Sequence, residues 1–358
     1  MKVYKTKVCL VILIAVGLAT LVGCGPAPAP PGWSGLLVAE GRLYTGSQSG
    51  RVHALDAQNG MELWQYPPAT EKEGIGSIYA TPVLLGGTLY VGSLNGKLYA
   101  LDANTGSQRW EFASGDRIFA GAAVADGTLY LCSSDHKVYA LDANTGAKKW
   151  EFTTGNWVWG RPVVANGGVY VASFDHKVYR LDAVSGTKQW ERQTGGALAD
   201  APVVSGDLVY CGSFDGSVHA LDASSGQVRW TFETGHWVWA SPLAVGDMVY
   251  VSSLDKSVYA LDASTGVKRW SFETDGMIRG APAYSNGLLY VGTEAGTLYV
   301  LDAASGVQKW SAEKDGQILA SPVVVGGAVY IGMQNGTIYA LDAESGVQRL
   351  VLTPGATE

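Results

Sequence analysis

Residues 161–196 read RPVVANGGVYVASFDHKVYRLDAVSGTKQWERQTGG, and copies of this unit follow one another along the chain. Four short runs in the unit are rich in Val, Tyr and Trp, and Asn-Gly, Asp-His and Ser-Gly turns separate them. The runs cover residues 162–165, 168–173, 177–182 and 187–192. Four strands joined by tight hairpins form one antiparallel sheet, which is what each copy predicts.

A tyrosine in the second run marks each copy, at positions 44, 90, 130, 170, 210, 250, 290 and 330. The first spacing is 46 residues and the other six are 40. The inner strands are apolar on both faces, since Val138 and Ala140 lie on one side of the third strand and Tyr139 and Leu141 on the other. Such a sheet must be covered on both sides. The sequence therefore predicts an all-β fold, an eight-bladed β-propeller of four-stranded antiparallel blades, over residues 33–358.

The turn after the third strand carries a second repeated pattern. Residues 100–110 read ALDANTGSQRW and resemble the tryptophan-docking motif, A-x-D-x-x-T-G-x-x-x-W, of quinoprotein-type (PQQ-like) propeller repeats. Eight copies around a ring cannot all be one active site, so we interpret the Asp as the acceptor in an Asx-type turn, the Gly as a residue with positive φ, and the Trp as a packing anchor. The docking residues of two consecutive copies are Asp102, Gly106, Trp110, Asp142, Gly146 and Trp150.

The fourth strand is predicted to lie outermost, and in most copies charges flank its Trp and protect the exposed sheet edge. The last copy departs from this pattern, because Leu350 stands in the Trp position and no charge follows. This strand is either covered where the ring closes or exposed as a partner site, and we favour the first alternative. Every copy has its own first and fourth strand, so the sequence gives no sign of strand exchange between the chain ends.

The N-terminal segment is predicted to direct export. Residues 1–24 place three lysines ahead of an apolar run at 8–22, the order of a secretory signal. Residues 21–24, LVGC, resemble the lipobox of bacterial lipoproteins, in which Cys24 would be lipidated; the alternative is an ordinary signal with an incidental cysteine. Residues 25–32, GPAPAPPG, predict a Pro-rich tether. We expect an exported protein with a lipid anchor in the cell envelope, facing the periplasm from an outer membrane or, with one membrane, at the cell surface.

Composition excludes one class of partner and leaves the cysteines structural. The 358 residues include 47 % hydrophobic and 16 % charged residues, with a net charge of −7. Removal of residues 1–24, which hold three lysines and no acid, makes the charge −10, so nucleic acid is not expected as a partner. Cys132 and Cys211 are predicted to be buried as small apolar residues.

No catalytic residue, metal or cofactor is expected. The repeat resembles that of quinoprotein dehydrogenases, which bind PQQ and Ca²⁺ at the axis and often carry a disulfide between adjacent cysteines. This chain has no adjacent cysteines and lacks the extra length of those enzymes. Its five histidines lack zinc-type spacing, and no G-x-S-x-G motif is present. His136 and His176 occupy the hairpin position at which Gly96, Gly216 and Gly336 stand in other copies, and a surface turn is favoured there over a metal site.

The copies diverge at the junctions between one unit and the next. The middle residue is always aliphatic, whereas its two neighbours vary and, with the period of a strand, are predicted to point toward the mouth of the ring. Aromatic residues and Arg gather there, as in interface hot spots. We expect either a partner or ligand face, or rings that pack on each other and plug the funnel; the insertion at 69–74 is expected on the same side. The candidate face comprises Trp157, Trp159, Trp237, Trp239, Tyr79, Phe119, Arg117, Arg161, Asp200 and Arg279.

A lipobox, a short tether and an eight-bladed PQQ-like propeller together resemble the BamB family of lipoproteins, which belongs to the outer-membrane β-barrel assembly machinery. The resemblance implies a non-enzymatic, membrane-anchored interaction scaffold, a monomer within a complex, with envelope proteins and the β-barrel assembly machinery as partners. The repeats here are more regular than those of the family. The alternatives are a small-ligand or glycan-binding propeller, or a relative of the PQQ-dependent dehydrogenases.

Overall fold

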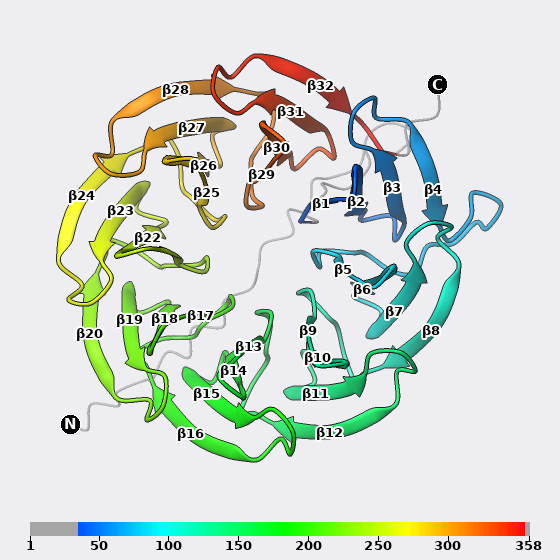
Figure 1. The fold of residues 1–358 in the computed structure, drawn as a ribbon, viewed down its shortest axis with the longest axis horizontal. Coiled ribbons are helices and arrows are strands. Elements are labelled where there is room, and N and C mark those ends of the chain that lie inside the picture. Colours follow the sequence, from blue (N-terminus) through cyan, green and yellow to red (C-terminus); the bar gives the residue numbers. More distant parts are fainter. Residues whose placement is uncertain (1–34, 355–358) are drawn as a thin grey trace, which may run out of the picture.

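The computed structural model describes residues 35–354, in which 32 strands form eight four-stranded sheets around a central axis (Figure 1). No helix occurs in this part of the chain, and so none there is long and apolar enough to span a membrane. The predicted all-β, eight-bladed propeller is confirmed. The signal and lipobox at 1–24, with Cys24, and the tether at 25–32 lie outside the described residues.

The blades are numbered here 1 to 8 in chain order. Blades 1 to 4 comprise β1 (Leu37–Ala39), β2 (Arg42–Gly46), β3 (Val52–Asp56), β4 (Glu62–Tyr66); β5 (Val83–Leu85), β6 (Thr88–Gly92), β7 (Lys97–Asp102), β8 (Gln108–Ala113); β9 (Ala123–Ala125), β10 (Thr128–Cys132), β11 (Lys137–Asp142), β12 (Lys148–Thr153); and β13 (Val163–Ala165), β14 (Gly168–Ala172), β15 (Lys177–Asp182), β16 (Lys188–Gln193). Blades 5 to 8 comprise β17 (Val203–Ser205), β18 (Leu208–Gly212), β19 (Ser217–Asp222), β20 (Val228–Glu233); β21 (Leu243–Val245), β22 (Met248–Ser252), β23 (Ser257–Asp262), β24 (Lys268–Glu273); β25 (Ala283–Ser285), β26 (Leu288–Gly292), β27 (Thr297–Asp302), β28 (Gln308–Glu313); and β29 (Val323–Val325), β30 (Ala328–Gly332), β31 (Ile338–Asp342), β32 (Gln348–Leu352).

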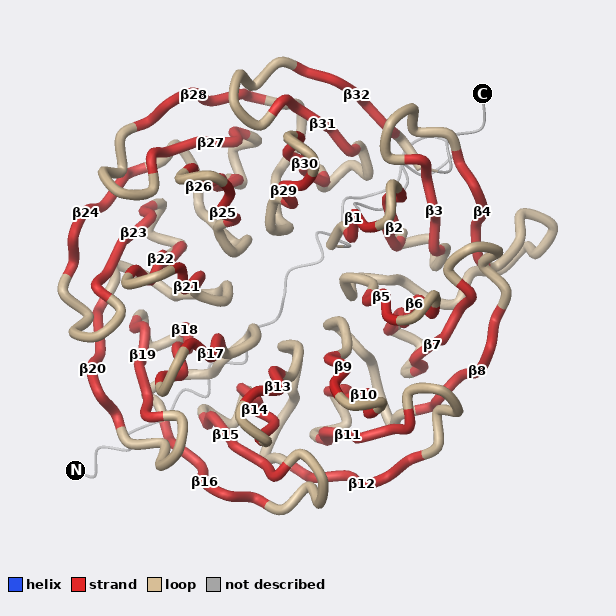
Figure 2. Tube along the Cα trace, in the orientation of Figure 1, coloured by secondary structure: helices blue, strands red, loops and turns tan. Residues whose placement is uncertain are grey.

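Each blade runs outward from the hub to the rim in sequence order. The three-residue first strand lies nearest the axis and the fourth strand forms the rim (Figure 2). All pairings are antiparallel between consecutive strands, and no strand is exchanged between blades 1 and 8. The first two hairpin turns of a blade therefore lie on opposite faces of the ring. The junction to the next blade shares its face with the turn between the second and third strands.

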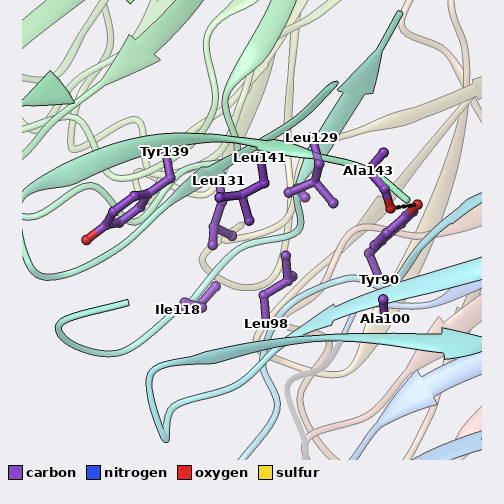
Figure 3. Packing of buried hydrophobic residues seen from close by; sticks show 10 residues of the cluster. Tyr90, Leu98, Ala100, Ile118, Leu129, Leu131, Tyr139, Leu141 and Ala143 are labelled. Carbon is purple, nitrogen blue, oxygen red and sulfur yellow. Dashed lines mark hydrogen bonds between the residues drawn. The ribbon is translucent and has the colours of Figure 1, made fainter. Parts of the chain in front are cut away.

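The core lies between the blades, because the second and third strands are apolar on both sides. Between blades 2 and 3, for example, Leu98 of β7 packs against Ile118, Leu129 and Leu131, all of them buried (Figure 3). Corresponding clusters fill the space between the other pairs of blades. Cys132 and Cys211 are buried in these clusters as free cysteines, and burial raises the pKa of both thiols.

The docking motif joins each blade to the next. Gly106 has a φ of 71°, and a Cβ there would lie 2.6 Å from Cε3 of Trp64 in the preceding blade, so only glycine lets the indole lie this close. Trp64 Nε1 also donates a hydrogen bond to the carbonyl of Ala103 at 3.0 Å. Trp110, Trp150, Trp190, Trp230, Trp270 and Trp310 lie on the glycine of the following blade in the same way.

The repeated tyrosine supplies a second link between blades. Tyr90 Oη donates to the carbonyl of Ala143 in the next blade at 2.9 Å, and the other seven tyrosines make the equivalent bond. The bond from Tyr330 to Ala57 closes the ring at 3.3 Å. At this closure Leu352 replaces an indole against Gly60, and Leu350 packs beside it. The inward side of the last strand is therefore covered as expected, whereas Val351 on its outer side is 44 % exposed.

The docking aspartate holds its turn through both carboxylate oxygens. Asp102 Oδ1 accepts the backbone N–H groups of Asn104 at 2.9 Å and Thr105 at 3.0 Å, while Oδ2 accepts from Arg109 at 2.6 Å. The hydrogen bond from Arg109, together with these backbone donors, lowers the pKa of Asp102 to about 2. The carboxylate is therefore part of the turn and is fully ionised at neutral pH.

We expect Gly146→Ala to destabilise the protein more than Gly127→Ala. Both glycines of blade 3 have positive φ, which costs an alanine about 1 kcal/mol. A Cβ at 127 meets no atom within 4 Å, whereas one at 146 would lie 2.6 Å from Trp110, and this overlap should add roughly 1–3 kcal/mol. Urea unfolding of the two variants measures the difference. Equal free energies of unfolding would contradict the indole-on-glycine contact.

We expect Asp102→Asn to unfold at a lower temperature than the parent protein at neutral pH. Because folding lowers the pKa of Asp102 from 3.8 to about 2, its charged form stabilises the folded state above pH 3.8, and this contribution is lost as the pH falls toward 2. The difference between the two proteins should therefore shrink over that interval. Thermal unfolding followed by circular dichroism across this pH range measures it, and a constant difference would be the opposite result.

Candidate interaction face

Each junction between blades is anchored by one buried aliphatic side chain. These side chains are buried beneath the face, as the alternating pattern predicts, and they are Ile78, Ile118, Val158, Leu198, Val238, Ile278 and Ile318. The backbone on either side is tied to both adjacent blades. Thr154 N donates to the carbonyl of His136 in blade 3 at 2.7 Å, and Phe174 N of blade 4 donates to the carbonyl of Trp157 at 2.9 Å.

The aromatic side chains of these junctions lie in one continuous series, which we call the aromatic arc. Its contacts run from Tyr79 to Phe119 with ring centres 6.3 Å apart, and from Phe119 to Trp159 at 4.7 Å. Trp157 and Trp159 are stacked at 5.6 Å with an angle of 6° between their planes. The arc comprises Tyr79, Phe119, Trp157, Trp159, Phe174, Phe214, Trp237 and Trp239.

Two phenylalanines that the sequence analysis did not select join the two tryptophan pairs. Phe174 lies 4.4 Å from Trp159, and Phe214 lies 5.9 Å from Phe174 and is stacked on Trp237 at 4.6 Å. Both residues occupy the turn between the second and third strands of their blades. This turn position also varies among the copies, with Leu, Ser, Phe, Phe, Leu, Glu and Gln from residue 94 to residue 334, so divergence was a usable signal.

The arc is both packed and open to solvent. Trp157 is 43 % exposed, whereas Trp159, Trp237, Trp239 and Phe119 are half-buried. Trp159 Nε1 is buried and has no hydrogen-bond partner among the described residues. The rings therefore pack on one another, as one of the two alternatives expects, while part of their surface stays accessible.

The charged residues of the candidate face differ in their roles. The guanidinium of Arg279 lies 5.0 Å from the ring centre of Trp239 and also pairs with Glu294, so it extends the arc at one end. Arg117 and Arg161 are exposed. Asp200 accepts the N–H of Ala201 at 2.7 Å and that of Ser241 at 2.9 Å, so this carboxylate links the junction of blade 5 to that of blade 6.

The Asp-His pairs that were weighed as a metal site form hairpin turns in the structure. His136 and His176 have φ angles of 71° and 69°, in the left-handed conformation expected for these hairpins. Asp135 accepts hydrogen bonds from Lys137 N, Gly115 N and the hydroxyl of Tyr139. Within residues 35–354 no three His, Cys, Asp or Glu side chains are arranged to hold a metal ion.

Two further features are a depression beside the arc and the insertion at the rim. A shallow depression of about 260 Å³ lies beside Trp237, with Asp215, Thr234 and His236 in its lining. The insertion after β4 extends outward from the rim on the right of Figure 1. Arg51 fixes its base by donating to the carbonyls of Pro67 at 2.7 Å and Glu71 at 2.6 Å.

Together the blades and docking motifs define an eight-bladed propeller of the PQQ-like repeat class. The family model described as outer membrane protein assembly factor BamB matches residues 32–110, 94–203, 194–279 and 274–350, and the chain belongs to this family. No curated protein sequence matches the chain significantly.

Two solved structures are similar in fold. BamB from Moraxella catarrhalis has a TM-score of 0.74 and 23 % identity, over 85 % of this chain and 95 % of that one. The computationally designed protein Ika8 has a TM-score of 0.76 and 17 % identity, over 87 % of this chain and 96 % of that one. At these identities the likeness establishes the fold, and function has to be argued from the residues.

We expect Trp159→Ala to cost more stability than Trp157→Ala. Trp159 is half-buried and contacts Phe119, Trp157 and Phe174, so its removal should cost roughly 2–3 kcal/mol. Because Trp157 is more exposed, Trp157→Ala should cost less stability, about 1 kcal/mol or below. Urea unfolding of the two variants measures both values. A larger loss at Trp157 would mean that the arc packs in another way.

Proposed function

We propose that the protein is a non-enzymatic scaffold of the cell envelope, anchored by lipid at Cys24, which binds a protein partner through the aromatic arc. Membership of the BamB family supports an envelope role, and the β-barrel assembly machinery is the partner that this membership favours. The observation that carries the proposal is the arc itself, a continuous series of aromatic rings at the junctions on one face.

The arc has the properties of an interface that binds without large rearrangement. Trp, Tyr and Arg are the side chains that contribute most to protein interfaces, and Arg279 lies over the ring of Trp239 at one end of the arc. Each junction is held by backbone hydrogen bonds to two blades, and the rings restrict one another's rotation. Binding would therefore order few side chains, which keeps its entropic cost low.

The tether is part of the same proposal. Residues 25–32 alternate Pro with small residues, a composition that favours an extended, semi-rigid spacer. Lipidation at Cys24 would leave the propeller a short distance from the membrane, free to present the face with the arc to another envelope protein. The high negative charge of the mature chain opposes attraction to anionic lipid, so the acyl chains would supply the membrane affinity.

A second candidate function is glycan binding at the depression beside Trp237. There Trp237 and Phe214 are stacked with 11° between their planes, and Asp215, Thr234 and His236 supply polar groups next to an aromatic surface. Sugars are bound by this combination of a flat ring and hydrogen-bonding side chains. The depression is shallow, so this function ranks second.

The test is a double variant, Trp157→Ala with Trp237→Ala, in the full-length lipidated protein. We expect it to fold and reach the envelope but to lose at least about tenfold in affinity for components of the β-barrel assembly machinery, because two rings of the arc are removed. Quantitative co-purification from envelopes measures this loss.

The control is Val184→Ala with Val307→Ala, which removes two exposed apolar side chains from turns on the opposite face. It should retain the partner. Undiminished capture by the tryptophan variant would contradict a role for the arc. Loss of oligosaccharide binding with full retention of protein partners would favour the second candidate.

A further inference from the structure

Blade 4 contains a charged residue at a position that is small and apolar in every other blade. Arg180 of β15 is paired with Tyr170 of β14 and Trp190 of β16, in the row that faces blade 5. The residues at this position in the other blades are Ala54, Ala100, Ala140, Ala220, Ala260, Val300 and Ala340. A long cation therefore lies where the shared architecture needs only a methyl group.

A second change in the same blade makes room for Arg180. Gly168 starts β14, and a Cβ at this position would lie 2.6 Å from Nε of Arg180. The other blades carry larger residues there, namely Arg42, Thr88, Thr128, Leu208, Met248, Leu288 and Ala328. The Arg180 side chain thus fills the space that a side chain at 168 would occupy.

Within the fold the guanidinium makes one hydrogen bond, and the charge of the Asp182 carboxylate compensates it in part. Arg180 Nη2 donates to the carbonyl of Asn166 at 3.0 Å, and the guanidinium carbon lies 5.6 Å from the ring centre of Tyr170. Arg180 Nε is buried without a hydrogen-bond partner among the described residues. An under-used cation at the edge of a core opposes folding, and such departures from local rules concentrate at functional sites.

Blade 1 offers a comparison, because its arginine, Arg42, has its hydrogen bonds supplied by the neighbouring blade. Most outer strands carry Lys or Arg close to the docking aspartate, but blade 1 has Leu63 and blade 4 has Gln189. In blade 1, Arg42 reaches across to blade 2 and donates to the carbonyl of Ala103 at 3.0 Å and to Asn104 at 2.7 Å. Arg180 bonds within its own blade instead, so the space toward blade 5 stays open.

This space is a cleft of about 400 Å³ between blades 4 and 5, on the face opposite the aromatic arc. Its blade 5 side includes Asp222, whose carboxylate is occupied by Ser224, Ser225 and Arg229. Hydrogen bonds from these groups hold the pKa of Asp222 well below its usual range, so it remains an anion paired within the fold. The cations that line the cleft are then Arg180 inside it and Arg229 at its exposed edge. Asp207, an exposed acid, also lines the cleft.

We propose that this cleft binds a small hydroxylated carboxylate of the size of a monosaccharide acid, with its carboxylate on Arg180. A guanidinium offers two parallel donors that match a carboxylate, and the buried ring of Tyr170 packs against the guanidinium from within the fold. At the opening, Asp207 accepts hydrogen bonds from ligand hydroxyls, and the side chain of Asn166 both accepts and donates them. The site is independent of the proposed partner face, because it lies on the other side of the ring.

The test uses D-glucuronate as the probe and full-length protein in detergent, with ligand-observed NMR and isothermal titration calorimetry. We expect saturable binding of glucuronate with a dissociation constant below about 10 mM. Glucuronamide and glucose, which lack the charge, should bind at least about tenfold more weakly. Arg180→Ala restores the residue that other blades carry, so this variant should fold and lose at least about tenfold in affinity for glucuronate. Gly168→Thr, which displaces Arg180 without removing it, should weaken binding too.

The matched control is Arg42→Ala, which removes the structural arginine of blade 1 and should leave glucuronate binding unchanged. The proposal is overturned if the parent protein shows no saturable binding up to that concentration, if glucuronamide binds as well as glucuronate, or if Arg180→Ala retains the parent affinity. A stronger effect of Arg42→Ala than of Arg180→Ala would also overturn it, because the cleft between blades 4 and 5 would not then be the site.

Discussion

The ring depends on the contact between an indole and the glycine turn of the following blade. A twisted sheet that is apolar on both faces needs a neighbour on each side, and this contact sets how closely the neighbour approaches. The Asx turn shapes the loop, and its glycine adopts positive φ and has no side chain that would block the indole. The indole N–H donates to the carbonyl next to the docking aspartate. Tyrosine hydroxyls bind the same carbonyls from nearer the hub.

Because these contacts repeat, the shared positions are fully used by architecture, and function falls to the positions at which the copies differ. The junctions and the turns between second and third strands diverge together on one face, where they form the aromatic arc. Blade 4 diverges on the opposite face, where Arg180 and Gly168 replace the usual pair of residues. The two faces of the ring are therefore chemically distinct, although the scaffold is nearly uniform.

The fold was predictable because its signals are periodic. Residue spacing, two-sided apolar strands and the docking motif all indicate eight four-stranded blades, and the aliphatic junction residues indicate which of their neighbours face outward. The site was predictable only in part. Phe174 and Phe214 stand at a turn position whose divergence was a signal, but their contacts with the junction rings depend on side-chain packing that the pattern does not determine. Asp200 binds backbone N–H groups of two junctions. The openness beside Arg180 depends on where a flexible side chain goes, which its position in a strand does not determine.

The way the ring closes has a consequence for how the chain can be connected. Blades 1 and 8 share no strand and meet through Tyr330, which keeps the tyrosine bond of the other seven joints, and through Leu350 and Leu352 in place of the indole. Every sheet is consequently a complete stretch of sequence, and no blade owes its hydrogen-bonded ladder to both termini at once. Circular permutation at any junction would leave all eight sheets whole, so the position of the native termini is free to serve attachment.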